Sequence, residues 1–430
     1  MLLRDCCKFQ EGYVNPPQSN AAFFDGDIKW LRSLDLNDGF VYETSRTLTK
    51  KGFESAGKSA YMFPANSLAI SKSGSIGKLG ILQDEMCGNR AVINIQVDEN
   101  VANLRYVFYL LKYKYLEVVG KAVGSIQKNL YVSELETLEL NHADLSEQKK
   151  IASVLSALDD KIALNKKMNQ KLEAMAKRLY DYWFVQYDFP DKNGHPYKIT
   201  GGPMTYNPTL KREIPAGWEV KRLGDLFETN RGVSYSTPTL GAEGDGVPMI
   251  NLASFSPNES YNEKGIKYYK GDYTDEKVLK PFDFVMCNTQ QTAIDPQKDI
   301  IGRSMLVPDI FDGDIVSSHH VNTIKLEKEN LKFYLNRLFN TKFYHAYISK
   351  FANGTNILGL IFSGVEDYMC EIPSDDLLEK FAKISLDIEK KKSKIIKENQ
   401  KLTALRDKLL PLLMNGQVVV GGGGLIFWNL

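Results

Sequence analysis

Residues 169–174 read NQKLEA and residues 399–404 read NQKLTA, so nearly the same phrase occurs twice, 230 positions apart. Extending both copies outward gives core-type residues at every seventh position. They are Leu158, Asn165, Leu172 and Leu179 in the first copy, and Ile388, Ile395, Leu402 and Leu409 in the second. A seven-residue apolar spacing on helix-forming residues is typical of a coiled-coil seam. The sequence therefore predicts two long helices that pack on one another, with the polar Asn165 fixing their register.

Both predicted helices are long, and proline is absent until Pro190 after the first and Pro411 at the end of the second. At ~1.5 Å per residue, residues 144–183 would span on the order of 55–60 Å. If the helices pack antiparallel, the segments before them would sit at opposite ends of a rod longer than the ~34 Å of one DNA turn. Such a chain would read two short DNA segments separated by a stretch that it does not read. The alternative is two unrelated surface helices built from common helix formers.

The segments that precede the two helices also correspond to one another. The matched pairs are LLRDCCKFQEG (2–12) with RLGDLFETNRG (222–232), WLRSLDL (30–36) with MINLASF (249–255), GKLGIL (77–82) with GRSMLV (302–307), RAVINIQV (90–97) with HHVNTIKL (319–326), NLRYVFYLL (103–111) with NLKFYLNRL (330–338), and GSIQKNL (124–130) with GTNILGL (354–360). Short β-type runs between turn residues predict mixed, strand-rich modules. We therefore predict an α+β protein in which two similar modules are separated by two long helices in an antiparallel coiled coil, with pseudo-two-fold symmetry.

These matches set the predicted domain boundaries. They are a first module at 1–143, a long helix at 144–186, an extended linker at 187–220, a second module at 221–373, a second long helix at 374–418, and a disordered tail at 419–430. The linker is rich in proline and glycine, which favours an extended, weakly structured connector.

Composition limits the function classes. The chain has 430 residues, 43% hydrophobic and 25% charged, with a formal charge of +1, which excludes coating of nucleic acid by bulk charge. No apolar run approaches the roughly 20 residues that cross a bilayer, and the first residues resemble no export signal. The five cysteines include no C-x-x-C pair. We expect a cytoplasmic protein that does not contact a membrane.

Four motifs imitate catalytic or ligand sites. NPPQ (15–18) approaches the N-P-P-[YF] loop of adenine methyltransferases but has no aromatic residue to stack on a base. Pro190-Asp191 with Glu219 and Lys221 imitates a nuclease pattern, and SGSIGKLG (73–80) lacks the frame of a phosphate loop. The pair His319-His320 has no further ligands at metal-binding spacing. We interpret the first three as ordinary turn or strand residues, and the histidines as surface or DNA-facing.

Candidate DNA-contacting residues are the basic and amide side chains on predicted turns. In the first module they are Lys72, Ser73, Lys78, Arg90, Lys121, Gln127, Lys128 and Asn129. In the second they are Arg231, Asn288, Gln290, Gln291, Arg303, His319, His320, Lys350, Asn353 and Asn356. NTQQT (288–292) is prominent because consecutive amides can read adenine edges. Residues 221–373 carry 16 basic and 20 acidic side chains, so we expect tight DNA binding to need partner proteins.

Three stretches together resemble the specificity subunits of type I restriction–modification enzymes. They are LSEQKKIASVLSALDDKIALNKKMNQKLEAMAKRLYDYWFV (145–185), EIPAGWEVKRLGDLFE (213–228) and LRDKLLPLLMNGQV (405–418). The resemblance implies two target-recognition domains that read double-stranded DNA, and helices that dock two adenine-methylating subunits. It also implies motor-nuclease subunits, with S-adenosylmethionine in the methylating partner and ATP and Mg²⁺ in the motor-nuclease partner. No catalytic residue, cofactor or metal is then expected in this chain.

The chain departs from the family pattern at two places. DLLEKFAKI (376–384) stands where a match to EQKKIA is expected, and GGGGLIFWNL (421–430) is an unusual end. Two other functions are compatible with parts of the sequence. One is a self-contained adenine DNA methyltransferase centred on NPPQ, and the other is a coiled-coil adaptor that does not bind DNA.

Overall fold

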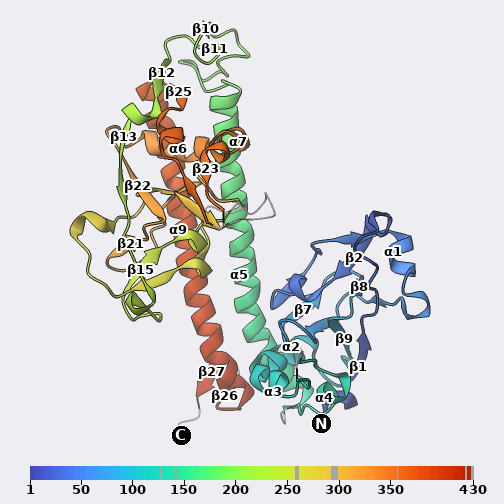
Figure 1. The fold of residues 1–430 in the computed structure, drawn as a ribbon. Coiled ribbons are helices and arrows are strands. Elements are labelled where there is room, and N and C mark those ends of the chain that lie inside the picture. Colours follow the sequence, from blue (N-terminus) through green and yellow to red (C-terminus); the bar gives the residue numbers. More distant parts are fainter. Residues whose placement is uncertain are drawn as a thin grey trace. The chain divides into compact units, whose positions relative to one another are not determined.

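The computed structural model describes residues 1–125, 128–140, 143–256, 261–291, 299–355, 357–421 and 424–427 (Figure 1). The chain divides into two units, each of which takes residues from both long helices. Unit 1 contains Met1–Ala163 and Gln400–Leu430, and unit 2 contains Leu164–Asn399.

Unit 1 contains a strand-rich module followed by the start of the first long helix. Its strands are β1 (Cys7–Glu11), β2 (Phe24–Leu31), β3 (Gly39–Val41), β4 (Thr47–Leu48), β5 (Met62–Phe63), β6 (Leu68–Ser71), β7 (Leu79–Leu82), β8 (Met86–Gly88) and β9 (Val92–Val97), and its short helices are α1 (Lys50–Glu54), α2 (Leu104–Tyr113), α3 (Tyr115–Gly120) and α4 (Val132–Glu136). One sheet has the order β1-β9-β6-β7-β3 and the other the order β4-β2-β8-β5. Alternating apolar residues of β6 and β9 pack with α2 in one core.

Unit 2 contains the second module and the connector before it. Its strands are β10 (Met204–Asn207), β11 (Arg212–Pro215), β12 (Glu219–Arg222), β13 (Phe227–Arg231), β14 (Leu240–Gly241), β15 (Val247–Ile250), β16 (Lys267–Tyr269), β17 (Val278–Leu279), β18 (Phe284–Cys287), β19 (Thr289–Gln291), β20 (Ser304–Leu306), β21 (Ile315–Ser317), β22 (Val321–Leu326), β23 (Ala352–Asn353), β24 (Ile357–Leu360) and β25 (Met369–Ile372), and its short helices are α6 (Leu331–Phe339), α7 (Lys342–Ile348) and α8 (Ser363–Glu366). The central sheet has the order β13-β22-β18-β20.

The two modules repeat one another in strand pairing. The order β1-β9-β6-β7 in unit 1 matches β13-β22-β18-β20 in unit 2, with antiparallel neighbours throughout. Each module also has one matching parallel pair, Trp30 with Cys87 and Met249 with Val316. Helix α2 matches α6, as the sequence correspondence predicts. The prediction of two similar mixed modules is confirmed.

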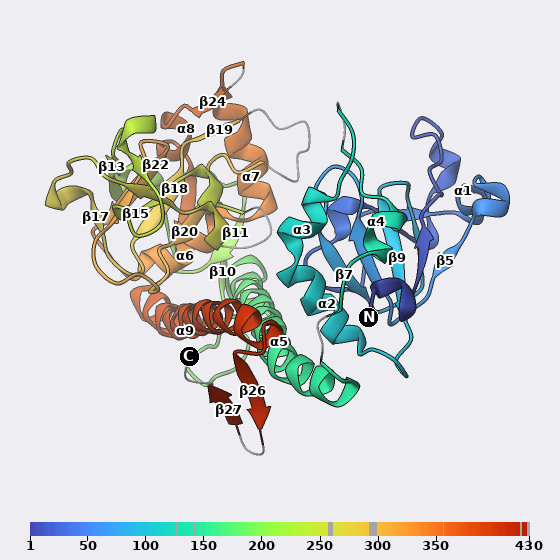
Figure 2. The same ribbon diagram turned by 90° about the horizontal axis from the view of Figure 1, so that it is seen from below.

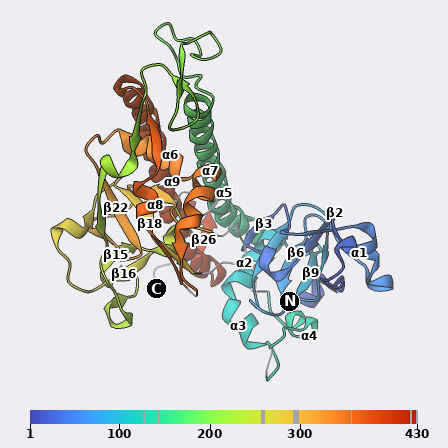
Figure 3. The same cartoon turned by 45° about the horizontal axis from the view of Figure 1, so that its top comes forward.

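The two long helices are α5 (Leu145–Tyr180) and α9 (Asp375–Met414), and they run side by side (Figures 1 and 3). In unit 2 the Asn165 amide donates to Glu398 and Asn399, both at 2.9 Å, and the Asn169 amide donates to the Lys392 carbonyl at 3.5 Å. Because the partner's number falls as the first number rises, the pair is antiparallel. No helix in the described part of the chain is long and apolar enough to span a bilayer.

The residues of the predicted seam differ in how deeply they are covered. Asn165, Ile388, Ile395 and Leu409 are buried, while Leu158, Leu172, Leu179 and Leu402 are half-buried. In unit 1, α5 and α9 share a core with α2 through Ile151, Leu155 and Leu413. The helix pair therefore packs against its module as well as along its own seam.

A cluster of four charges, buried except for the partly exposed Glu173, joins both helices to the second module. Arg337 of α6 donates to Glu173 of α5 and, at 3.0 Å, to Glu389 of α9. Lys392 of α9 lies 2.7 Å from Glu173 and 3.0 Å from Glu389. Burial opposes ionisation, but Arg337 and Lys392 together lower the pKa of Glu173 to about 2. Two acids and two bases thus balance one another.

The connector is more ordered than the sequence predicts. Strands β10 and β11 form a hairpin. Phe189 stacks between Tyr197, at 4.5 Å, and Trp218, at 5.5 Å between ring centroids. These aromatic rings pack with the core at the end of α5. The prediction of a weakly structured linker is therefore wrong, because its aromatic residues find apolar surface to cover despite the many prolines and glycines.

The C-terminal prediction is also corrected. Helix α9 ends at Met414, and β26 (Val418–Gly421) pairs antiparallel with β27 (Gly424–Phe427). Val418 is buried in the core of unit 1. The expectation of a disordered tail is wrong for these two strands, because β-branched and apolar residues on both sides of a run of glycines favour a hairpin. Residues 422–423 and 428–430 lie outside the described part of the chain.

We predict that Arg337→Met destabilises the protein by about 3–5 kcal/mol, because it leaves the buried Glu389 and the partly exposed Glu173 with one base. Urea unfolding of the full chain measures this change. The matched control is Arg222→Met, which removes the exposed pair with Asp367 and should cost at most about 1 kcal/mol. Equal losses for the two variants would show that the buried cluster is not a special constraint.

We also predict a pH dependence from Glu173. Its pKa is about 2 in the folded protein against 4.5 as the ordinary value, so its stabilisation is complete above about pH 4.5 and is lost as the pH falls toward 2. Wild type should therefore unfold at higher urea than Glu173→Gln at pH 7, and the difference should shrink on acidification. A difference that stays constant from pH 7 to pH 3 would contradict this account.

Candidate nucleic-acid interface

In unit 1, three loops meet beside the end of β6. The Lys72 backbone N–H donates to the Ala91 carbonyl at 2.8 Å, and the Lys72 carbonyl accepts from Leu130 N–H at 2.9 Å. The Lys72 ammonium lies 2.9 Å from a carboxylate oxygen of Glu11, at the end of β1. Lys72 therefore joins the loops that follow β6, precede β9 and follow α3.

The next residues form a tight turn. Ser71 Oγ accepts from the Lys78 backbone N–H at 3.0 Å and donates to the Ser75 carbonyl. Gly77 has a φ of +86°, and a Cβ there would lie 2.9 Å from the Tyr115 ring, so glycine is required. The motif SGSIGKLG is thus a turn that leaves Ser73 and Lys78 half-buried beside Lys72.

Unit 2 has the same arrangement of loops around Asn288. We call the two arrangements corners, the first around Lys72 and the second around Asn288. The Asn288 N–H donates to the His320 carbonyl at 2.9 Å, and its carbonyl accepts from Leu360 N–H at 2.8 Å. The Asn288 amide also donates to Asn322 Oδ1 at 2.6 Å. Arg231, at the end of β13, occupies the position of Glu11 and donates to the His319 carbonyl at 2.8 Å. The backbone pattern is shared, but the side chains differ in charge and type.

Aromatic and imidazole rings surround this second corner. The rings of His319 and His320 lie 3.9 Å apart, and Tyr235 lies 5.4 Å from His319. His320 Nδ1 lies 2.8 Å from Thr289 Oγ1. Burial, followed by electrostatic effects of His319, Arg231 and Lys267, lowers the pKa of His320 to about 4. His320 is therefore neutral near pH 7 and acts as a hydrogen-bonding group.

The predicted contact residues fall into two groups. Those with exposed side chains are Arg90, Lys128, Arg231, Lys350 and Asn353. The half-buried ones are Lys72, Ser73, Lys78, Lys121, Asn129, Asn288, Arg303, His319 and His320. Lys121 bonds to Thr137 and lies 3.9 Å from Glu134, and Arg303 donates to the Asp299 carbonyl. The structure gathers Lys72 and Asn129 at the first corner, and Arg231, Asn288, His319, His320 and Asn353 at the second.

One prediction about NTQQT is corrected. Gln290 is only 5% exposed, and its side-chain oxygen accepts from the backbone N–H groups of Ile300 and Ile301. The side chain supports the loop from inside, since strand alternation turns it away from the face of Thr289. Gln127, Asn356 and the side chain of Gln291 lie outside the described part of the structure.

Each corner is completed by a hairpin that the sequence comparison aligns. Val123 bridges Asn129 in unit 1, and Asn353 pairs with Gly359 in unit 2. The hairpins turn at Gly124, with φ +139°, and Gly354, with φ +136°. Glu11 and Thr289 also lie at the corners but are not among the DNA-contacting residues predicted from the sequence. Their position at strand ends that align between the two halves could have indicated them.

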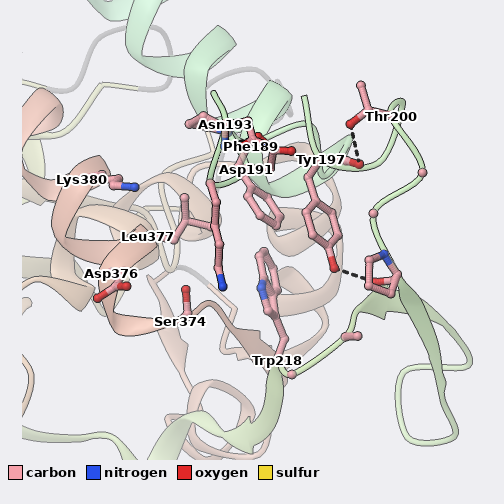
Figure 4. Close-up of a pocket in the computed structure, with 17 residues that line it drawn as sticks. Phe189, Asp191, Asn193, Tyr197, Thr200, Trp218, Ser374, Asp376, Leu377 and Lys380 are labelled. Atoms are coloured by element: carbon pink, nitrogen blue, oxygen red, sulfur yellow. Dashed lines mark hydrogen bonds between the residues drawn. The ribbon is translucent and has the colours of Figure 1, made fainter. Parts of the chain in front are cut away.

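The other motifs contribute no site. Gln18 of NPPQ donates to the Pro16 carbonyl and accepts from Arg46. Glu219 and Lys221 pair with each other on the exposed strand β12. An open cavity of about 670 Å³ lies between the connector and the start of α9, with Trp218 and Lys380 in its wall (Figure 4). Within the described residues, no three His, Cys, Asp or Glu side chains are grouped to hold a metal ion.

Comparison with known proteins shows which proteins this chain is similar to. Residues 3–174 match the model of the type I restriction modification DNA specificity domain. The chain is 28% identical over 416 residues to the type I restriction enzyme MjaIX specificity subunit of Methanocaldococcus jannaschii, covering 95% of this chain and 91% of the relative. It is 24% identical over 379 residues to the HindI specificity subunit of Haemophilus influenzae, covering 75% and 79%.

A solved structure shares the fold. The type I restriction-modification S subunit from M. genitalium aligns over 96% of this chain and 95% of that chain, with a TM-score of 0.54 and 16% identity. The family match, the curated relatives and the duplicated architecture agree with one another. Residues 3–174 therefore match a type I restriction modification DNA specificity domain, and over most of its length the chain is similar to specificity subunits of type I restriction enzymes.

Proposed function

We propose that this chain reads a bipartite, asymmetric DNA target, with one short segment contacted by each module. The observation that carries the proposal is the repeated corner with exchanged side chains. The backbone bonds around Lys72 recur around Asn288, while Glu11 is replaced by Arg231. Two similar surfaces with different donors and acceptors would recognise two different base sequences. A coiled-coil adaptor would have no need for such a pair.

We propose further that the chain has no catalytic role of its own and assembles the subunits that do the chemistry. Adenine methylation, with S-adenosylmethionine, would belong to two methylating subunits, and cleavage, with ATP and Mg²⁺, to motor-nuclease subunits. Support comes from α5 and the π-helical turn Asp181–Val185 that continues it, where Leu164, Met168, Met175 and Tyr182 are exposed at spacings of four and seven residues. This apolar stripe within unit 2 has the spacing of a helix-packing surface.

The acidic balance of the second module gives the partners a second task. Residues 221–373 carry 20 acidic and 16 basic side chains, so long-range attraction to phosphate is weak. Without that attraction, base contacts alone would give only weak binding to a DNA duplex. The partners would supply the phosphate contacts that complete the grip on DNA.

The first test is genome-wide mapping of N6-methyladenine. Cells with this gene and its partner genes should carry a split methylated motif that is absent without the gene. Replacing residues 1–143 by the matching module of a relative should change one half of the motif and leave the other half intact. A map that does not depend on the gene would refute the proposed function. Methyl transfer by the chain alone would instead support a self-contained methyltransferase.

The second test compares DNA binding by the isolated chain and by the complex. In physiological salt the isolated chain should bind its target no better than the ~10⁻⁴–10⁻⁶ M of non-specific binding. The complex should reach the ~10⁻⁸–10⁻¹¹ M of specific binding. Titration by fluorescence anisotropy measures both. Nanomolar binding by the isolated chain would show that the partners are not needed for affinity.

A further inference from the structure

A small sheet in unit 2 presents a mixed polar and apolar face beside the Asn288 corner. It contains β19, β24 and β23 in that order, and β24 projects from the edge of the unit (Figure 2). Gly359 of β24 pairs with Thr289 on one side and Asn353 on the other. Side chains of directly paired residues lie on the same face of a sheet. Thr289 and Asn353 therefore lie on either side of Gly359, which has no side chain on that face.

The same alternation places Ile357 on that face, two residues before Gly359. The opposite face points inward, because Leu360 packs against the core of unit 2 and Gln290, which pairs with Leu358, is buried. Ile357 is 56% exposed despite its size and its place in a strand. Most of this apolar side chain, next to exposed Asn353 and to the Thr289–His320 pair, is therefore free for a contact from outside the chain.

This face matches the edge of a base pair in the major groove. An Asn amide can pair with adenine N6 and N7, and an apolar side chain can contact the C5 methyl group of thymine. Asn353 and Ile357 are diagonal neighbours on adjacent strands, which places them roughly 7–8 Å apart. That separation is about two base steps of ~3.4 Å each. Gly359 between them leaves room for the bases to approach.

We propose that the face formed by Thr289, Asn353, Ile357 and Gly359 reads bases in the major groove, and that Ile357 recognises a thymine methyl group. This inference rests on the proposed function, since it requires the second module to contact DNA. It assigns the specificity of one half-site to a defined face and one base contact to an apolar side chain.

Gly359 offers a direct test of the face. A Cβ at Gly359 would have only the Asn353 carbonyl within 4 Å, at 3.9 Å, and its φ does not demand glycine, so Gly359→Val is compatible with the fold. The added side chain would stand on the proposed face and hold the bases away. With the partner subunits present, methylation of the wild-type motif should fall by more than tenfold, with the melting temperature unchanged. The control is Ile199→Ala, an exposed apolar residue of the connector, which should leave methylation intact.

The thymine contact is tested separately with Ile357→Ala. Each thymine in the half-site of the second module is replaced in turn by deoxyuridine, which lacks only the methyl group. At one position the wild-type complex should bind about fourfold more weakly, the effect expected for one buried methyl group. The Ile357→Ala complex should show no such loss at that position.

The outcomes separate the two proposals. If the methylation map does not depend on this gene, the proposed function fails. If the wild-type motif is split as expected, but Gly359→Val and Ile357→Ala both keep the full rate and the same motif, only the reading face is overturned. A half-site without thymine, or an equal deoxyuridine effect in wild type and Ile357→Ala, would overturn the role of Ile357.

Discussion

The antiparallel pairing of α5 with α9 is the constraint on which both units depend. Each unit takes a stretch of both helices into its own core, so neither module could keep its packing if the helices shifted register. The contacts that set the register are polar: Asn165 with Glu398 and Asn399, and the four-charge cluster around Arg337. Buried polar groups of this kind stabilise less than apolar packing, but they allow one alignment of the helices, because any shift would leave them unpaired. Under the proposed function, in which the helix pair spaces two DNA-reading modules, a single alignment matters more than extra stability.

The duplicated corner shows which features the fold requires and which it leaves free. Backbone bonds to residues 72 and 288 are the same in both modules, as are the positive φ angles of Gly124 and Gly354. These features depend on main-chain atoms, so the side chains at the corner can change without loss of the loop geometry. Lys72 with Glu11 and Asn288 with Arg231 are two solutions on one framework. The side chains at the corner can therefore diverge without divergence of the fold.

The sequence predicted the repeated elements well, because a seven-residue period and aligned strand-like runs are local signals. It failed where a residue's role depends on what the fold places beside it. Phe189 and Trp218 stand among prolines and glycines, yet they stack and order the connector. Gln290 looked like a base-reading amide, but strand alternation turns it inward to accept from Ile300 and Ile301. Ile357 could not be noticed at all, since an isoleucine in a strand is read as core until its exposure is known.

Charge and hydrogen bonding are divided differently in the two modules. The first corner keeps a lysine beside a glutamate, so its charge is largely balanced locally. The second combines Arg231 with neutral groups, because burial and nearby positive charges keep His320 uncharged. Neutral donors and acceptors discriminate bases without adding attraction to phosphate, so they contribute to specificity more than to affinity. Under the proposed function, such a corner would distinguish sequences but attract phosphate weakly, so that binding would depend on the partner subunits.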